Sequence, residues 1–197
     1  MNSEFKSIIF SDEELQKRQE CNWLKGCKLF NNSVQTEANK QIMIDRNGNV
    51  TGAKPSPNDE TPGVFIDKVN GYSYIRLHNK GMISLQVAMK YVFFDEIECV
   101  YDEPLVDDVV DHINGDKKDN RLSNLRIVSK QFNSHNHERC RDNITQLPSE
   151  AKLTTNELTK LKCYADDEHY YFELRPNLYY KTSKTSKLPK WISRTRN

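Results

Sequence analysis

One stretch of this chain, residues 109–137, places an Asp-His pair, a tight turn and a polar helix close together. It reads VVDHINGDKKDNRLSNLRIVSKQFNSHNH. The β-branched residues before the Asp-His pair favour a short strand over residues 108–112. Asn114-Gly115-Asp116 is a strong turn signal, because these residue types adopt turn conformations readily. The chain is therefore expected to reverse direction directly after the Asp-His pair.

A second strand and a helix are expected to follow the turn. Residues 124–129, NLRIVS, contain the apolar and β-branched residues typical of a strand. Ser129 is a suitable N-cap for a helix that begins at Lys130 and runs roughly ten residues, to near Cys140. The stretch as a whole predicts two strands and one helix, a ββα unit.

The side chains of this unit suit the hydrolysis of a phosphodiester, which needs a base to activate water and a metal to neutralise charge. His112 is the residue type that titrates near neutral pH and suits the base. Asp111 and Asn133 offer hard oxygen ligands for magnesium or manganese. His137, on the same helical face as Asn133, would widen the choice to zinc or nickel. Adjacent strand residues point to opposite faces, so a bulge or bend would bring Asp111 and His112 to one site.

This order of residues resembles the HNH endonuclease family, in the Asp-His…Asn…Asn branch of phage-type and homing nucleases. The resemblance implies an α+β fold around a ββα-metal nuclease unit that straddles one metal ion, flanked by small β-hairpin and helix segments. It assigns the metal-binding acid to Asp111, the general base to His112, and the steadying of the loop and the catalytic histidine to Asn124. Asn133 corresponds to the helix residue that completes the metal site, and His137 to a further ligand that some relatives have.

The same resemblance implies a metal-dependent DNA endonuclease, of a phage or viral homing type, that acts on double-stranded DNA with Mg²⁺ or Mn²⁺ as a monomer or homodimer. Asn120 also recurs in this family, and we expect it to hold the connecting loop, since Asn side chains readily bond nearby backbone amides. Two alternatives stay open. One is a restriction or defence HNH nuclease, and the other is a non-catalytic DNA-binding regulator derived from such an enzyme.

The formal net charge is only +1, but the basic residues are unevenly distributed. No acidic residue follows Glu173, while lysines and arginines continue to the end of the chain, and a second basic zone lies within the ββα unit. Two basic zones on a neutral chain are typical of a protein that touches nucleic acid along one surface. The candidate DNA-binding residues are Lys117, Lys118, Arg121, Arg126, Lys130, Arg139, Lys181, Lys184, Lys187 and Lys190.

Cysteine usage and hydropathy bear on the compartment and on zinc. The five cysteines form no C-x-x-C pair, so a structural zinc is not predicted, although cysteine-bound zinc in some HNH restriction enzymes leaves the question open. No apolar run approaches the roughly 18 residues of a membrane span. The N-terminus lacks the pattern of a secretory signal. We expect a cytoplasmic protein, in the host cell if the source is a virus.

The rest of the chain divides into three expected regions: residues 1–62 with an N-terminal helix and β-hairpin, residues 63–145 with the nuclease domain, and residues 146–197 with a basic, aromatic, DNA-contacting module. In the first region, residues 11–24 predict a helix capped by Ser11, and the Asn47-Gly48 turn within residues 41–50 predicts a hairpin. In the second, residues 64–77 predict a hairpin that turns at Asn70-Gly71.

Residues 83–94 predict a helix that packs on this second hairpin. The hairpin and helix resemble the segment that precedes the site in many phage-type homing endonucleases. In those enzymes the helix usually opens with a His-Arg pair, and here Leu85 and Gln86 stand at about that place. The departure removes a common basic contact.

The C-terminal region predicts a short helix over residues 153–161 and aromatic strands over residues 168–174 and 178–181. Its lysines and hydroxyls suit phosphate contact, and its tyrosines and Trp191 suit either base stacking or the core of a small domain.

Overall fold

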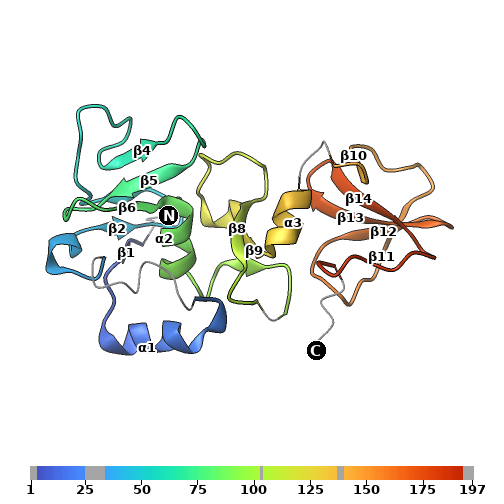
Figure 1. The fold of residues 1–197 in the computed structure, drawn as a ribbon, viewed down its shortest axis with the longest axis horizontal. Coiled ribbons are helices and arrows are strands. Elements are labelled where there is room, and N and C mark those ends of the chain that lie inside the picture. The colour runs from blue at the N-terminus through green and yellow to red at the C-terminus, as the bar shows by residue number, and fades with distance from the viewer. Residues whose placement is uncertain (1–3, 25–33, 103, 137–139, 193–197) are drawn as a thin grey trace.

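The computed structural model describes residues 4–24, 34–102, 104–136 and 140–192. It is a mixed α+β protein with several small sheets arranged in a row (Figure 1). The N-terminal sheets and helix α2 lie at one end, strands β8 and β9 with helix α3 lie in the middle, and the C-terminal sheet lies at the other end. His137 and Arg139, two of the candidate site residues, lie outside the described residues.

The N-terminal helix α1 (Asp12–Glu20) begins as the sequence predicts. The Ser11 side chain accepts a hydrogen bond from the Glu14 backbone, and the Glu14 side chain accepts one from the Ser11 backbone. This reciprocal capping box satisfies two backbone donors that the first turn leaves unpaired. Two short 3-10 helices lie between α1 and the next strands: Asn22–Leu24 and Glu37–Asn39.

Two three-stranded antiparallel sheets follow, each containing one of the predicted hairpins. The first has the order β1 (Lys6–Ser7), β2 (Met43–Ile44), β3 (Val50–Thr51). The second has the order β4 (Val64–Ile66), β5 (Ser73–Arg76), β6 (Met82–Ser84). Gly48 and Gly71 have φ of +75° and +77° in the two turns, a conformation that glycine adopts without steric cost. Both hairpin predictions are confirmed.

Helix α2 (Leu85–Val92) packs on β5 and β6, as expected. It begins two residues later than predicted, because Ile83 pairs with Ile75 as part of β6. The sequence ISLQVAMK is apolar in both a strand and a helix register, so its pattern alone did not mark this boundary.

The central sheet has the order β7 (Glu98–Cys99), β9 (Leu125–Val128), β8 (Val109–His112). β8 and β9 are antiparallel, and β7 runs parallel to β9. A 3-10 helix, Leu122–Asn124, leads into β9, and α3 (Lys130–His135) follows it. The Ser129 side chain accepts a hydrogen bond from the Phe132 backbone at 3.0 Å, which confirms the predicted cap. The helix ends at His135 with Asn136 as its C-cap, earlier than the predicted end near Cys140.

The C-terminal sheet is antiparallel throughout, with the order β10 (Asn143–Ile144), β14 (Leu178–Ser183), β13 (His169–Arg175), β12 (Cys163–Ala165), β11 (Lys152–Thr154). The predicted strands at β13 and β14 are confirmed. The predicted helix over residues 153–161 is wrong, because Leu153 and Leu158 remain 69% and 47% exposed and residues 152–154 pair with β12 instead.

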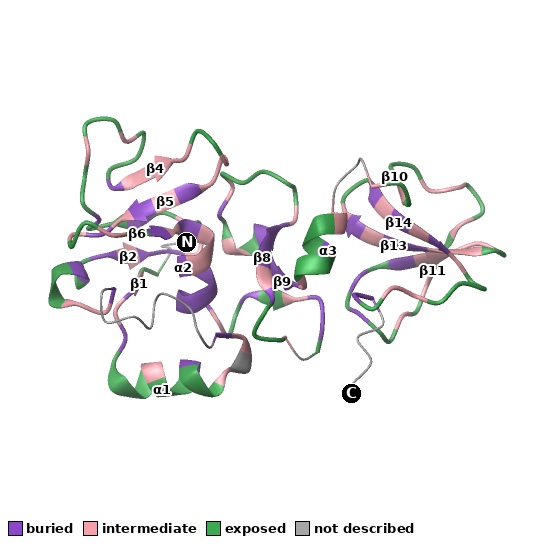
Figure 2. Ribbon diagram, viewed as in Figure 1, coloured by how far each residue is buried: buried purple, intermediate pink, exposed green. Residues whose placement is uncertain are grey.

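Two hydrophobic cores hold the protein together, and the strands of the ββα unit contribute to both (Figure 2). Val110, Leu125 and Ile127 pack into the first core with α2 and the N-terminal sheets. Val128 and Phe132 pack into the second core with the C-terminal sheet. The C-terminal region is therefore joined to the ββα unit by shared packing.

Tyr180 and Trp191 belong to the second core, with 8% and 4% of their surfaces exposed. Trp191 packs edge-on against Phe132 at a ring-centroid distance of 5.6 Å. For these two aromatic residues the structure favours packing inside the protein over stacking on a base. Among the described residues, no helix is both long and apolar enough to cross a membrane.

Candidate active site

His112 ends strand β8 and is buried, with 4% of its surface exposed. Its Nε2 lies 3.3 Å from the Oδ1 of Asn120, whose Nδ2 donates to the carbonyl of Lys118 at 3.0 Å. Asn120 in this orientation presents an acceptor to the ring, so we assign the proton to Nε2 and the basic lone pair to Nδ1. Asn120 was expected only to hold the loop, and in the structure it also orients His112.

The environment of His112 favours the neutral ring. Burial lowers the pKa of His112 below its ordinary value of 6.5, while the Asn120 contact and the nearby charge of Asp111 act in the opposite direction. A lowered pKa leaves the imidazole unprotonated at neutral pH, and this is the state that a general base requires.

Asn124 holds the connection between β8 and β9. Its Oδ1 accepts from the Asn114 backbone at 3.0 Å, and its Nδ2 donates to the Asn114 side chain at 3.0 Å and to the Asp119 carbonyl at 2.8 Å. Three hydrogen bonds from one side chain fix the start and the end of this loop relative to β9. The described contact with the His112 ring is made by Asn120, within the loop that Asn124 holds.

Asp111 is buried beside Arg126, its cross-strand partner on β9. The Arg126 Nε and Nη2 atoms lie 3.0 and 2.8 Å from the Asp111 Oδ2. Nη2 also donates to the carbonyl of Leu174 in β13, and the guanidinium lies over the Phe132 ring at 4.9 Å. Arg126 was expected to contact DNA. In the structure its side chain is committed to a carboxylate and a carbonyl inside the protein, and the residue is only 5% exposed.

The helix residue that reaches Asp111 is Asn136. Its Nδ2 lies 3.0 Å from both carboxylate oxygens of Asp111. Asn133, the helix residue expected to complete the metal site, is exposed on α3. Asn136 stands three residues after Asn133. The resemblance assigned the metal-binding role to Asn133 and gave no role to Asn136.

Asp111 and His112 are neighbours at the end of a regular strand. The register runs without a shift from Asp111 opposite Arg126 to His112 opposite Leu125, so the bulge considered above is absent from this ladder. Tyr72, just before β5, lies next to His112 with the two ring centroids 6.1 Å apart. This neighbour comes from a different sheet, and no pattern in the sequence identified it.

The other expected DNA-binding residues are at the surface in two groups. Lys117, Lys118, Arg121 and Lys130 are exposed around the ββα unit, although Arg121 forms an ion pair with Asp119 at 2.6 Å. In the C-terminal region, Lys184, Lys187 and Lys190 are exposed and Lys181 is half-buried.

A comparison with known families matches the central segment of the chain. The model of the family described as HNH endonuclease covers residues 103–135. This segment is an HNH endonuclease domain. It includes β8, β9 and α3, and it ends one residue before Asn136. No curated protein and no solved structure matches the chain.

The HNH domain offers oxygen ligands to a divalent cation. The Oδ1 of Asn136 is buried without a hydrogen-bond partner, while the other end of the same amide lies against the Asp111 carboxylate. A buried, unsatisfied oxygen beside a carboxylate suits a hard cation such as Mg²⁺ or Mn²⁺. Within the described residues no three His, Cys, Asp or Glu side chains cluster as they would for zinc.

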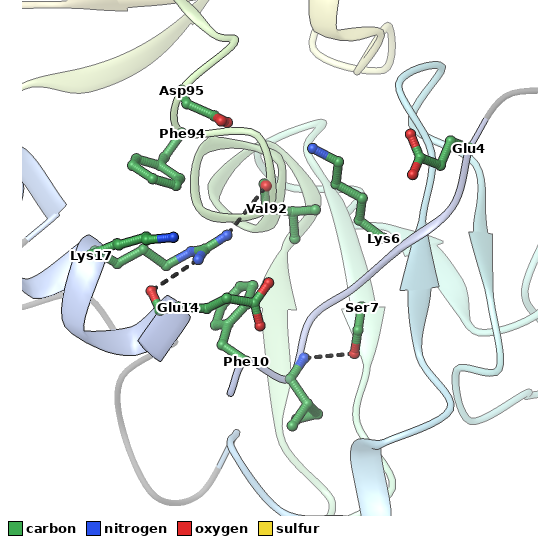
Figure 3. A pocket seen from close by; sticks show the side chains of 11 residues that line it. Glu4, Lys6, Ser7, Phe10, Glu14, Lys17, Val92, Phe94 and Asp95 are labelled. Atoms are coloured by element: carbon green, nitrogen blue, oxygen red, sulfur yellow. Dashed lines mark hydrogen bonds between the residues drawn. The ribbon is translucent and has the colours of Figure 1, made fainter. Parts of the chain in front are cut away.

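A cavity in the N-terminal part of the chain is lined by residues outside the HNH domain (Figure 3). It has a volume of about 430 Å³ and is lined by the N-terminal segment, α1 and the end of α2. Its lining mixes acidic side chains such as Glu14 and Asp95 with basic ones such as Lys6 and Lys17. Neither Asp111 nor His112 lines it.

Proposed function

We propose that this protein is a metal-dependent DNA endonuclease in which His112 is the general base. The observation that carries this proposal is the buried His112, held at Nε2 by Asn120 and directly preceded by Asp111 in strand β8 of an HNH domain. A restriction or defence nuclease would use the same groups, and a binding protein that had lost activity would have no need to keep them.

The mechanism follows from the atoms that the site presents. His112 Nδ1 takes a proton from a water molecule, and the resulting hydroxide attacks the phosphorus of the scissile phosphodiester. The Asn120 Oδ1 accepts a hydrogen bond from Nε2–H and so keeps Nδ1 as the basic nitrogen throughout the step. Burial lowers the pKa of His112 and so disfavours the protonated ring, which could not act as a base. The phosphorus–oxygen bond to the 3′ oxygen then breaks, which leaves a 5′-phosphate and a 3′-hydroxyl.

Asp111 would hold the divalent metal ion, with Asn136 as the helix ligand that the geometry favours. Asn133 and His137 remain the ligands expected from the sequence. When bound, Mg²⁺ or Mn²⁺ would neutralise charge on the phosphate and on the leaving oxygen. The carboxylate Oδ2 has two guanidinium contacts as well as the Asn136 amide, while among the described residues Oδ1 accepts from the Asn136 amide alone, so Oδ1 has fewer hydrogen bonds to give up to a metal.

DNA would lie across the exposed lysines of the connecting loop. Lys117, Lys118 and Lys130 supply positive charge beside the site, and such contacts position the backbone without reading sequence. The resemblance to phage-type homing nucleases supports a homing role in a host cytoplasm. The buried Leu85 at the start of α2 means that this position contributes no DNA contact.

The metal requirement tests the proposed function. A duplex DNA incubated with the protein should be cut in Mg²⁺ or Mn²⁺, should stay intact in excess chelator, and should be cut again when either metal is restored. Cleavage that continues unchanged in excess chelator would exclude the single-metal mechanism.

The helix ligand can be identified with two alanine variants. Asn136→Ala should reduce the cleavage rate by roughly 10- to 100-fold and raise the metal concentration that gives half-maximal activity, as loss of a group supporting a metal ligand does. Asn133→Ala, an exposed position on the same helix, should have a much smaller effect. If Asn133→Ala is the more damaging change, the sequence-based assignment holds and the described geometry is not that of the metal-bound site.

The C-terminal lysines can be tested without disturbing the second core. The Lys184→Ala/Lys187→Ala variant changes two exposed side chains and should leave the melting temperature unchanged. If both contact phosphates, the slope of log affinity against log salt should become shallower by roughly 0.9 for each contact. An unchanged slope would show that this end of the protein does not touch DNA.

A further inference from the structure

The turn between β4 and β5 lies beside the active site and is held by its own hydrogen bonds. The Asp67 side chain accepts from the Val69 backbone and from the Asn70 side chain, each at 2.8 Å. The Asp67 carbonyl accepts from the Gly71 backbone at 2.8 Å, and the Asn70 side chain accepts from the Tyr72 backbone at 2.9 Å. A turn with this many internal bonds presents its side chains in one arrangement before any ligand arrives.

Lys117, in the connecting loop of the HNH domain, joins that loop to this turn. Its Nζ donates to the Asn70 carbonyl at 2.9 Å and lies 4.5 Å from the centre of the Tyr72 ring. A Cβ on Gly71 would stand only 3.7 Å from the Lys117 side chain, so the loop and the turn are in van der Waals contact. One of the three N–H donors of the Lys117 ammonium is thus used inside the protein, while the residue stays exposed.

Tyr72 lies near both Lys117 and the catalytic histidine. Its ring centroid is 6.1 Å from that of His112, and the residue is half-buried. Burial, together with the charge of Asp111, raises the pKa of the Tyr72 hydroxyl, so this hydroxyl is protonated at neutral pH and is a hydrogen-bond donor. The first core packs β5 and β8 together, which fixes Tyr72 relative to the site.

We infer that Tyr72 and Lys117 form a phosphate-binding pair that holds one DNA phosphate beside His112. The inference rests on the proposed nuclease function and adds a residue, Tyr72, from outside the HNH domain. The Tyr72 ring lies 6.1 Å from the ring of the general base and 4.5 Å from the Lys117 ammonium, and the phenol and the ammonium both carry donors that suit a phosphate oxygen. The lysine charge attracts the backbone, and the phenol directs one hydrogen bond to it.

Tyr72→Phe and Lys117→Gln test this pair, because each keeps most of the side chain and removes the donor. Tyr72→Phe should lower kcat/KM by roughly 10- to 100-fold, the range for losing a hydrogen bond to a charged group. Lys117→Gln should weaken DNA binding, measured in chelator, and reduce the salt slope by about 0.9. Tyr170→Phe is the matched control, since Tyr170 also lies under a lysine, Lys184 at 5.4 Å, but in the C-terminal sheet. Lys152→Gln in β11 is the control for charge.

A neutral methylphosphonate placed at single positions around the mapped cut site identifies the phosphate. At one position the methylphosphonate should lower the cleavage rate of the wild-type protein. At that position it should lower the cleavage rates of Lys117→Gln and Tyr72→Phe much less, because these variants already lack a contact with that phosphate. Equal effects of every methylphosphonate on wild type and variants, or wild-type kinetics for both variants, would overturn the inference. If the wild-type protein cuts no DNA in Mg²⁺ or Mn²⁺, the proposed function itself fails. Melting temperatures are measured alongside, and a rate loss explained by unfolding in both variants also counts against the inference.

Discussion

Replacing His112 with alanine is expected to reduce DNA cleavage by ~10²–10⁴-fold, the usual cost of removing a positioned general base. DNA affinity should stay within a few-fold of wild type, because His112 is buried and the exposed lysines that attract the backbone are unchanged. Single-turnover cleavage and binding in chelator measure the two effects separately. His78→Ala is the control, since the Nε2 of His78 also lies against an oxygen acceptor, the Gly52 carbonyl at 2.7 Å, but outside the HNH domain.

The pH dependence of the wild-type cleavage rate tests the protonation state of His112. Because burial lowers the pKa of His112 below 6.5, the ring stays neutral and active across the neutral range. The rate should fall only as the pH drops through that lowered pKa and the base becomes protonated. Near-normal cleavage by His112→Ala would contradict the assigned base, whatever the pH profile.

Replacing Asp111 with alanine is expected to abolish metal-dependent cleavage and also to destabilise the fold. The carboxylate faces the buried Arg126 at 2.8 Å, and both side chains are 7% exposed. Removing one partner of a buried ion pair leaves an uncompensated charge, which costs about 3–5 kcal/mol in the free energy of unfolding. Chemical denaturation measures this loss, and a cleavage assay with titrated Mg²⁺ measures the loss of activity.

The Asp111→Ala/Arg126→Met variant separates the two roles of Asp111. Methionine fills similar space without a charge, so the double variant should recover much of the stability that Asp111→Ala loses. It should still fail to cut DNA, since the proposed metal-binding carboxylate is absent. Cleavage at the wild-type rate by this double variant would show that Asp111 is not required for the chemistry.

The helix caps and tight turns could be predicted from the sequence, because each depends on a few residues that are adjacent in the chain. Ser129 caps α3 because its side chain can accept a backbone donor of the first turn, and Asn47-Gly48 and Asn70-Gly71 form turns because glycine adopts positive φ. The family resemblance located the HNH domain at β8, β9 and α3. These features depend on residues that are close together along the chain, so they can be recognised in the sequence.

The interactions that shape the site depend on residues far apart in the sequence. The sequence alone predicted that Arg126 contacts DNA. It could not show that β13, which is distant in the sequence, packs beside Arg126 and accepts a hydrogen bond from it through the Leu174 carbonyl. Tyr72 reaches His112 only because β5 and β8 share a core. Asn136 was missed because only the packing of α3 against β8 brings its side chain to Asp111. No periodicity encodes such contacts, since they arise from how separate sheets pack.

The measurement that tests the central claim most directly follows a supercoiled plasmid incubated with the protein and Mg²⁺. Nicked or linear DNA should appear with wild type and not with His112→Ala. DNA ligase should reseal isolated nicks, because hydrolysis that releases the 3′ oxygen leaves a 5′-phosphate and a 3′-hydroxyl. A plasmid that stays supercoiled with the folded wild-type protein in both Mg²⁺ and Mn²⁺, or nicks that ligase cannot seal, would contradict the account of this HNH domain.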